Sequence, residues 1–298
     1  MLRDYVHSLL GIEEGLSDRN YKYGQFYLIR DSKPLIDQLP RYVPLRAGEY
    51  RILHALSGRA VFEMNMEKFT LEKGSVMITP PNSIGFFADY YYGFSAEILI
   101  LPQYFSELAR RSRCLLPAVV FKLQLSEKDE LRIGKVIDLL EEYMRIGLAS
   151  DSKNPFTKDC IDHLLLSLTS DLCQINGIQT ASNTHYSKQG QYFGQFMQLL
   201  NQYGSKERSL NFYAEKMNLS RNQLNAIILE QSGKSVMDWI YQTTIMEAKM
   251  LLSHTDLLIF EIAAQLQFSE PSAFIRFFRK QTGMSPGAYR KENMHLED

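Results

Sequence analysis

The chain has 298 residues, of which 45% are hydrophobic, and its formal net charge at pH 7 is −1. This length is sufficient for two domains with hydrophobic cores, and the near-neutral charge excludes a protein that is basic throughout. The three scattered cysteines exclude a disulfide framework, and no apolar run is long enough for a signal peptide or a membrane span, so we expect a cytoplasmic protein without membrane contact.

Residues 26–101 alternate between apolar and polar side chains as β-strands do, with turn residues at short intervals. The segments FYLIR from Phe26, RILHALSG from Arg51 and AEILIL from Ala96 are examples. Many short strands at this spacing predict an antiparallel β-barrel or jelly roll.

The most aromatic part of this region is FFADYYYGF, at residues 86–94. Its side chains could line a pocket for a small molecule, with Phe86, Phe87, Tyr90 and Tyr92 as the candidate pocket residues. Aromatic side chains also fill the cores and cover the rims of barrels without binding a ligand. The sequence leaves these two roles open.

Two helices are predicted after the strands, at residues 127–148 and 156–175, because apolar residues recur there every three or four positions. The apolar stripes of these two helices include Leu140, Met144, Leu164 and Leu168. Each stripe must pack either on the barrel or on a second copy of the chain, and the pattern supports both arrangements equally.

The polar segment NGIQTASNTHYSKQG, at residues 176–190, has the composition of a linker. It predicts an N-terminal domain at residues 1–175 and a C-terminal domain at residues 191–298. The division separates the predicted strands from the most regular helical pattern in the chain.

A pattern of apolar and turn residues occurs twice in the C-terminal third. The two copies are LNFYAEKMNLSRNQLNAIILEQSGKS from Leu210 and IFEIAAQLQFSEPSAFIRFFRKQTGMS from Ile259. Corresponding residues are 49 positions apart up to Ser220 and Ser269, and 50 positions apart after them. Two short helices, with a small alanine at their crossing and a serine before the second helix, are typical of a helix-turn-helix. Its duplication predicts binding to DNA.

Local signals mark the ends of the second helix in each copy. Ser220 and Ser269 are predicted N-caps, and Gly233 and Gly283 are predicted left-handed residues after the last turn. Between the copies, residues 236–253 predict a helix of about 27 Å. Such a helix can hold two recognition helices one turn of DNA apart, which is about 34 Å.

Several motifs in this region are specific. They are A-K-x-L-L at residues 248–252, I-A at residues 262–263 and F-x-R-x-F-R-K-x-x-G-x-x-P-x-x-Y-R at residues 274–290. Over about residues 195–292 the chain resembles the AraC/XylS family of bacterial transcription regulators. The resemblance implies two helix-turn-helix units in adjacent major grooves of double-stranded DNA. It also implies a sensing or dimerising N-terminal domain and control near promoters, where contact with RNA polymerase is possible.

The resemblance also assigns the DNA contacts. The expected contact residues are Arg221, Asn222, Gln223 and Asn225 in the first unit, and Ser272, Arg276, Arg279 and Lys280 in the second. Ala226 and Leu229 stand where the family commonly has cationic side chains, and Gln267 stands where it usually has glycine. Because the first unit has lost positive charge, we expect the second unit to supply most of the electrostatic attraction.

The segment from Gly58 through Gly74 to the proline turn at residues 80–82 is similar to the cupin-like sensor domains that precede such units. The expected fold is therefore α+β. An N-terminal cupin-like antiparallel β-barrel with a following helical pair precedes an all-α domain of two helix-turn-helix units joined by a linker helix.

Metal-dependent cupins need several converging histidines. Here His54 stands alone, and Gly85 lies near the place of the last ligand, so we expect no metal, no cofactor and no catalytic residue. The resemblance instead implies a small-molecule effector in the barrel and a homodimer formed by the helical pair. Control by a partner protein remains an open alternative.

Overall fold

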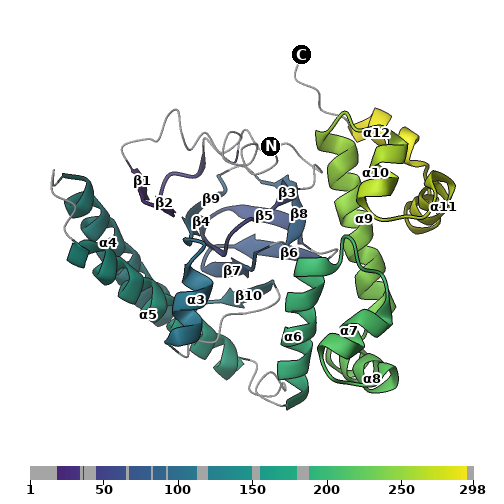
Figure 1. The fold of residues 1–298 in the computed structure, drawn as a ribbon. Coiled ribbons are helices and arrows are strands. Elements are labelled where there is room, and N and C mark those ends of the chain that lie inside the picture. The colour runs from purple at the N-terminus through teal and green to yellow at the C-terminus, as the bar shows by residue number, and fades with distance from the viewer. Residues whose placement is uncertain are drawn as a thin grey trace.

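A computed structural model of the protein describes residues 19–33, 36, 45–64, 67–81, 83–91, 93–112, 120–149, 155–179 and 188–293. The strands lie in the middle of the molecule, with helices α4 and α5 on one side and helices α6 to α12 on the other (Figure 1). The predicted α+β fold, with N-terminal strands and an all-helical C-terminal domain, is confirmed at this level.

The strands form two antiparallel sheets. The six-stranded sheet has the order β1 (Asn20–Tyr23), β2 (Phe26–Ile29), β9 (Ser95–Ile100), β4 (Arg51–Ser57), β7 (Ser75–Thr79) and β10 (Phe121–Gln124). The four-stranded sheet has the order β3 (Leu45–Arg46), β8 (Ile84–Tyr90), β5 (Arg59–Met64) and β6 (Glu67–Glu72). Within the described residues no strand pair joins the two sheets, so the prediction of a closed barrel is wrong.

Tight turns explain why the sheets remain separate. The chain passes from β4 in one sheet to β5 in the other at Gly58, which has a φ of 67°. A Cβ at Gly58 would lie 2.4 Å from the backbone nitrogen of Phe94, so only glycine fits this turn. Gly74 and Gly93 also have positive φ where the chain changes sheet. At each of these turns the next strand joins the opposite sheet.

Two hydrophobic cores flank the six-stranded sheet. Along β4, Ile52 packs into the core beneath helices α4 (Glu127–Ala149) and α5 (Pro155–Gln179), whereas Leu53 packs into the core between the sheets. The alternation follows from the two-residue period of a strand. A shorter helix, α3 (Phe105–Arg111), adds buried residues to the core beneath α4 and α5.

The apolar stripes of α4 and α5 face this core. Leu140 and Met144 are 0% exposed and Leu168 is 1% exposed, while the half-buried Leu164 packs against the same cluster. The sequence pattern left these stripes open between the barrel and a second copy, and the resemblance implied the second copy. The structure places Leu140, Met144 and Leu168 in the core of the same chain, which corrects the dimer assignment for these three residues, whereas Leu164 is only half-buried.

The region between the domains is shorter than the predicted linker at residues 176–190. Helix α5 ends at Gln179, and helix α6 begins at Lys188, so helices occupy both ends of that segment. Helices α4 and α5 are long, with 23 and 25 residues. No helix among the described residues is both long and apolar enough to cross a membrane.

The C-terminal domain consists of α6 (Lys188–Tyr203), α7 (Leu210–Lys216), α8 (Arg221–Ser232), α9 (Val236–His254), α10 (Ile259–Gln265), α11 (Pro271–Thr282) and α12 (Pro286–Asn293). It has two hydrophobic cores. Helices α6, α7 and α8 pack on the first half of α9, around residues such as Trp239, and α10, α11 and α12 pack on its second half, around Phe274 and Phe278. Helix α9 therefore belongs to both halves of the domain.

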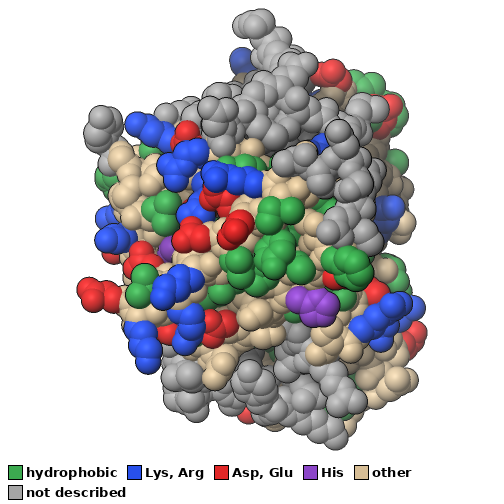
Figure 2. Space-filling model, turned by 90° about the vertical axis from the view of Figure 1, so that its left-hand side faces the viewer, with side chains coloured by type: hydrophobic (Ala, Val, Ile, Leu, Met, Phe, Trp, Pro, Cys, Tyr) green, Lys and Arg blue, Asp and Glu red, His purple; other side chains and the backbone are tan. Residues whose placement is uncertain are grey.

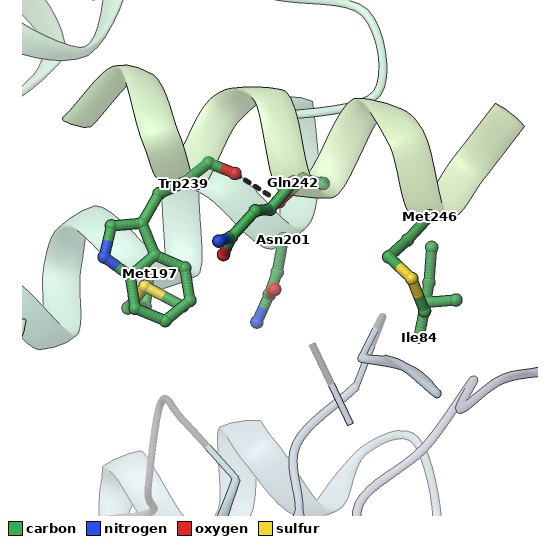
Figure 3. A pocket seen from close by; sticks show the side chains of 7 residues that line it. Ile84, Met197, Asn201, Trp239, Gln242 and Met246 are labelled. Atoms are coloured by element: carbon green, nitrogen blue, oxygen red, sulfur yellow. Dashed lines mark hydrogen bonds between the residues drawn. The ribbon is translucent and has the colours of Figure 1, made fainter. Parts of the chain in front are cut away.

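The sheets contact the C-terminal domain directly. Arg46 of β3 forms an ion pair with Glu247 of α9, and the ammonium of Lys234 lies 3.4 Å from the carboxylate of Glu67. Ile84 of β8 meets Met246 of α9 at a cavity of about 10 Å³, which is also lined by residues of α6 (Figure 3). That volume holds about one water molecule, so the contact leaves no room for a larger ligand.

Candidate nucleic-acid interface

The two sequence copies fold into two helix-turn-helix units. Helices α7 and α8 form the first unit, and helices α10 and α11 form the second. Ala214 and Ala263 are 3% and 1% exposed, as expected for small residues at a helix crossing. The turns have left-handed residues at equivalent positions, Asn218 with a φ of 52° and Gln267 with a φ of 55°. The backbone thus repeats along with the sequence pattern.

The second helix of each unit begins differently. Ser220 caps α8, accepting a hydrogen bond from the backbone N–H of Gln223 in a capping box. Ser269 was predicted to cap α11 in the same way, and this is wrong. The N-cap of α11 is Glu270, which makes no side-chain cap bond, and Pro271 is the first helical residue. The extra residue after Ser269 moves the serine one position away from the helix.

The recognition helices end as predicted. Gly233 and Gly283 have φ angles of 68° and 83°, and both donate a hydrogen bond to a carbonyl in the last turn. The linker helix α9 starts with a second capping box, formed by Ser235 and Asp238. These caps set where α8 and α9 start and where α8 and α11 stop.

Helix α11 exposes a basic face. Arg276, Arg279 and Lys280 are exposed, and none of them forms an ion pair with a residue that the structure describes. Ser272 is also exposed, and its hydroxyl lies 3.2 Å from the carboxylate of Glu270. The guanidinium and ammonium groups are therefore available for phosphates or base edges.

Helix α8 exposes fewer polar groups that are available to contact DNA than α11 does. Arg221 and Asn222 are exposed. Gln223 uses its carboxamide oxygen to accept a bond of 3.0 Å from the backbone N–H of Ser220. Asn225 is half-buried, and its oxygen accepts a bond of 3.1 Å from the backbone N–H of Val236. Two of the four residues predicted to contact DNA, Gln223 and Asn225, thus already form hydrogen bonds within the protein.

Arg208 links the two units, and sequence reasoning missed it. Its guanidinium donates hydrogen bonds to the backbone carbonyls of Leu266 and Gln267, in the turn of the second unit. It also lies 4.0 Å from the centre of the Phe268 ring. Burial lowers the pKa of Arg208 from its ordinary value. No motif indicated this contact, since it joins positions nearly 60 residues apart.

Both recognition helices lie on the side of α9 that faces away from the sheets (Figure 1). Helix α9 has 19 residues and is therefore about 28 Å long. The ring of Tyr241 on α9 contacts that of Phe277 on α11, with 5.4 Å between their centres. The two exposed faces are held in a fixed relation by this helix and by Arg208.

The predicted pocket aromatics have a different environment. Phe87 is 3% exposed in the core between the sheets, and its ring centre lies 4.8 Å from that of Phe62. Tyr90 packs against the same core, and Phe86 is half-buried. Tyr92 lies outside the described residues. Phe87 and Tyr90 thus help to fill a core. The described part of the chain has no group of three or more metal-ligating side chains.

Comparisons with known proteins agree with this architecture. Residues 213–292 match a family described as a helix-turn-helix domain. The Msm operon regulatory protein of Streptococcus mutans is 37% identical over 91 residues, which are 30% of this chain and 32% of that protein. The arabinose operon regulatory protein of Salmonella typhimurium is 23% identical over 252 residues, which are 83% of this chain and 85% of that protein.

Among solved structures, ToxT from Vibrio cholerae aligns over 91% of this chain and 96% of its own, with 14% identity and a TM-score of 0.44. The chain spans between 12% and 32% of the length of three of the curated relatives that it matches, all of them named as regulators. The duplicated unit, the motif residues and these curated relatives agree that the C-terminal domain is a helix-turn-helix domain of the AraC/XylS type, which is found in transcription regulators.

Proposed function

We propose that this chain is a sequence-specific regulator of transcription that binds double-stranded DNA with α8 and α11 in adjacent major grooves. The observation that carries the proposal is the pair of exposed recognition helices on one side of α9 (Figure 1). A linker helix of about 28 Å, together with the width of each unit, matches the spacing of about 34 Å between successive major grooves.

Arg276 is the strongest candidate for a base contact. It lies in the second turn of α11, is exposed and forms no ion pair with a described residue. A guanidinium can donate two hydrogen bonds to O6 and N7 of guanine, which no other base pair accepts in the same way. Arg279 and Lys280 lie one turn further along, where phosphate contacts are expected.

The test uses DNA sites selected from a random pool with the full chain. We expect Arg276→Ala to weaken binding to the selected site by about 1–3 kcal/mol and to relax specificity at one position. Arg110→Ala is the matched control, since Arg110 is exposed on α3 and pairs with Glu107. Fluorescence anisotropy measures the affinity of both variants for the selected duplex and for random duplexes. An equal loss on both duplexes would show that Arg276 contacts phosphate only.

We further propose that the N-terminal domain controls DNA binding. Arg46 and Glu67 of the sheets contact Glu247 and Lys234 of the DNA-binding domain, so movement of the sheets acts directly on α9. A small molecule bound to the sheets or a partner protein could supply that movement. Contact with RNA polymerase would follow if the chain activates promoters.

A homodimer is a separate part of the proposal. The stripes first assigned to it are buried, but the outer faces of α4 and α5 expose Leu139, Ile146 and Phe156 by 39%, 49% and 71%. Figure 2, which views the side of the molecule where α4 and α5 lie, shows hydrophobic side chains gathered there. Ile146→Glu should convert a dimer to a monomer in sedimentation, whereas Leu229→Glu on α8 should not. A wild-type chain that sediments as a monomer would contradict this part.

A further inference from the structure

A polar cleft lies between the six-stranded sheet and the first half of α4, on the side of the sheet away from the aromatic core. Its volume is about 400 Å³. Its lining includes Arg30, His54, Glu97, Glu127, Glu130 and Asp138. His54 of β4 and Glu97 of β9 are direct partners in the strand register. They form the buried floor of the cleft, at 3% and 4% exposure.

His54 has one satisfied nitrogen and one unsatisfied nitrogen. Its Nδ1 lies 3.1 Å from the Glu97 carboxylate, whose other oxygen lies 2.9 Å from the Arg30 guanidinium. An ionised carboxylate can only accept, so a proton lies on Nδ1, and in the corresponding neutral tautomer Nε2 is an acceptor. Nε2 is buried and has no hydrogen-bond partner among the described residues. A buried acceptor without a donor is costly, which indicates a missing partner.

Glu130 of α4 is the nearest charged group to this nitrogen. One of its carboxylate oxygens lies 3.9 Å from His54 Nε2, too far for a hydrogen bond between them. Both atoms accept, so a donor placed between them would satisfy both. Arg30 is engaged with Glu97, Asp138 and Glu141, at 2.7–2.9 Å. Its charge is therefore already balanced within the protein.

The exposed rim of the cleft has mixed charge. Glu127 and Asp138 lie there with Lys73 and Lys135, and all four side chains are exposed. Figure 2 shows acidic and basic side chains crowded beside the hydrophobic patch on this side of the molecule. Around the floor, Arg30 Nε is a buried donor without a partner among the described residues, whereas His54 Nε2 and the half-buried Glu130 carboxylate lie opposite each other. The position between His54 Nε2 and Glu130 therefore favours a donor, and the negative charge of Glu130 favours a cation there.

We propose that this cleft binds a small molecule through a primary ammonium group that donates to His54 Nε2 and to the Glu130 carboxylate. An ammonium has three hydrogens and a positive charge, so it can satisfy both acceptors and balance Glu130. A hydroxyl has a single hydrogen and can satisfy one of them. A carboxylate or phosphate would meet acceptors with no hydrogen to donate.

The cleft is distinct from the site that the family resemblance implied. The resemblance implied a site inside a barrel, with Phe86, Phe87 and Tyr90, which lie on β8 of the four-stranded sheet. His54 and Glu97 belong to the six-stranded sheet and line the cleft beside α4. Ammonium binding at this cleft does not depend on DNA binding. The proposal of ammonium binding can therefore fail while the proposal of DNA binding holds, and the reverse is also possible.

The test is isothermal titration calorimetry of the full chain with putrescine, and with 1,4-butanediol as a probe of equal length without charge. We expect putrescine to bind at least about tenfold more tightly than the diol, and Glu130→Gln to remove at least about tenfold of the putrescine affinity. Glu142→Gln, on an exposed position of α4 outside the cleft, is the matched control and should leave the affinity unchanged. His54→Gln should weaken putrescine as well.

Three results would overturn the proposal. The first is no putrescine binding at about 10 mM, since an ion pair with a hydrogen bond supports millimolar binding. The second is equal binding of diamine and diol. The third is an equal effect of Glu130→Gln and Glu142→Gln, which would place the amine elsewhere on the acidic surface.

Discussion

Helices α8 and α11 have 12 residues each and end at equivalent left-handed glycines, yet their outer faces have different side chains. In α11, Arg276, Arg279 and Lys280 are exposed and unpaired within the described residues. In α8, the exposed cation is Arg221, near the start of the helix. The second unit thus presents a basic face where the first presents a mostly neutral one.

This difference shows which residues a duplicated fold can change. The buried positions keep their character in both copies, because a change there leaves a cavity or a clash. Phe274 and Phe278 of the second unit, like Leu224 and Ile228 of the first, are fully buried. Exposed positions have no such constraint, so charge can be lost from one unit while its backbone is maintained. The predictions below test how far this division of roles extends.

The largest effect is expected for the salt dependence of DNA binding. Replacing Arg279 and Lys280 with glutamine removes the two proposed phosphate contacts and should reduce the slope of log K against log salt by about 1.8. Arg221→Ala should reduce it by less than about 0.9, because at most one contact is lost. Ala226→Arg should tighten binding by restoring a cation to α8. Fluorescence anisotropy over a range of salt measures all three variants. If Arg221→Ala flattens the slope most, the first unit is the main anchor.

The next effect concerns the link between the units. Arg208→Ala removes two charge-assisted hydrogen bonds to the turn of the second unit and should destabilise the domain by about 1–2 kcal/mol in urea denaturation. DNA with both half-sites should lose more affinity than DNA with one, because the spacing is no longer fixed. Arg208→Lys should recover little, since an ammonium cannot form the same pair of bonds. An equal loss of affinity for both DNAs would show that Arg208 acts only through the stability of the domain.

A smaller effect separates a structural role of Asn225 from a DNA contact. Asn225→Ala should destabilise the free protein by about 1 kcal/mol, because the Val236 N–H at the start of α9 loses its acceptor. Thermal unfolding without DNA measures this. Asn222→Ala, at an exposed neighbouring position, should leave stability unchanged. An unaltered melting temperature for Asn225→Ala would return this residue to the set of base contacts.

The smallest effect is a gain in stability. Gln267 has a φ of 55°, which is strained for a residue with a Cβ, so Gln267→Gly should stabilise the protein by about 0.5–1 kcal/mol. Asn218 has the equivalent conformation in the first unit, and asparagine tolerates it better. Asn218→Gly should therefore gain less in the same denaturation experiment. A larger gain at Asn218 would contradict the explanation by backbone strain.

Several predictions from sequence hold because they depend on few neighbouring residues. The cap at Ser220 and the left-handed Gly233 and Gly283 are formed within one turn of a helix. Ser269 failed for a local reason, because one additional residue moved it away from the start of α11. The fold of both units could be predicted because their periodicity and their helix ends agree.

The sequence by itself therefore determined the two helix-turn-helix units, the linker helix and a mainly β N-terminal domain, since each is specified by short-range pattern and by burial of one face. The tertiary structure alone decided that the sheets stay open, that the stripe with Leu140 and Met144 covers the sheet, and that Arg208 joins the two units. It also decided that Asn225 is already bonded and that His54 faces α4. The reason is physical: strand pairing, the partner of an apolar face and the acceptor of a hydrogen bond depend on residues distant in the chain, which a local pattern does not specify.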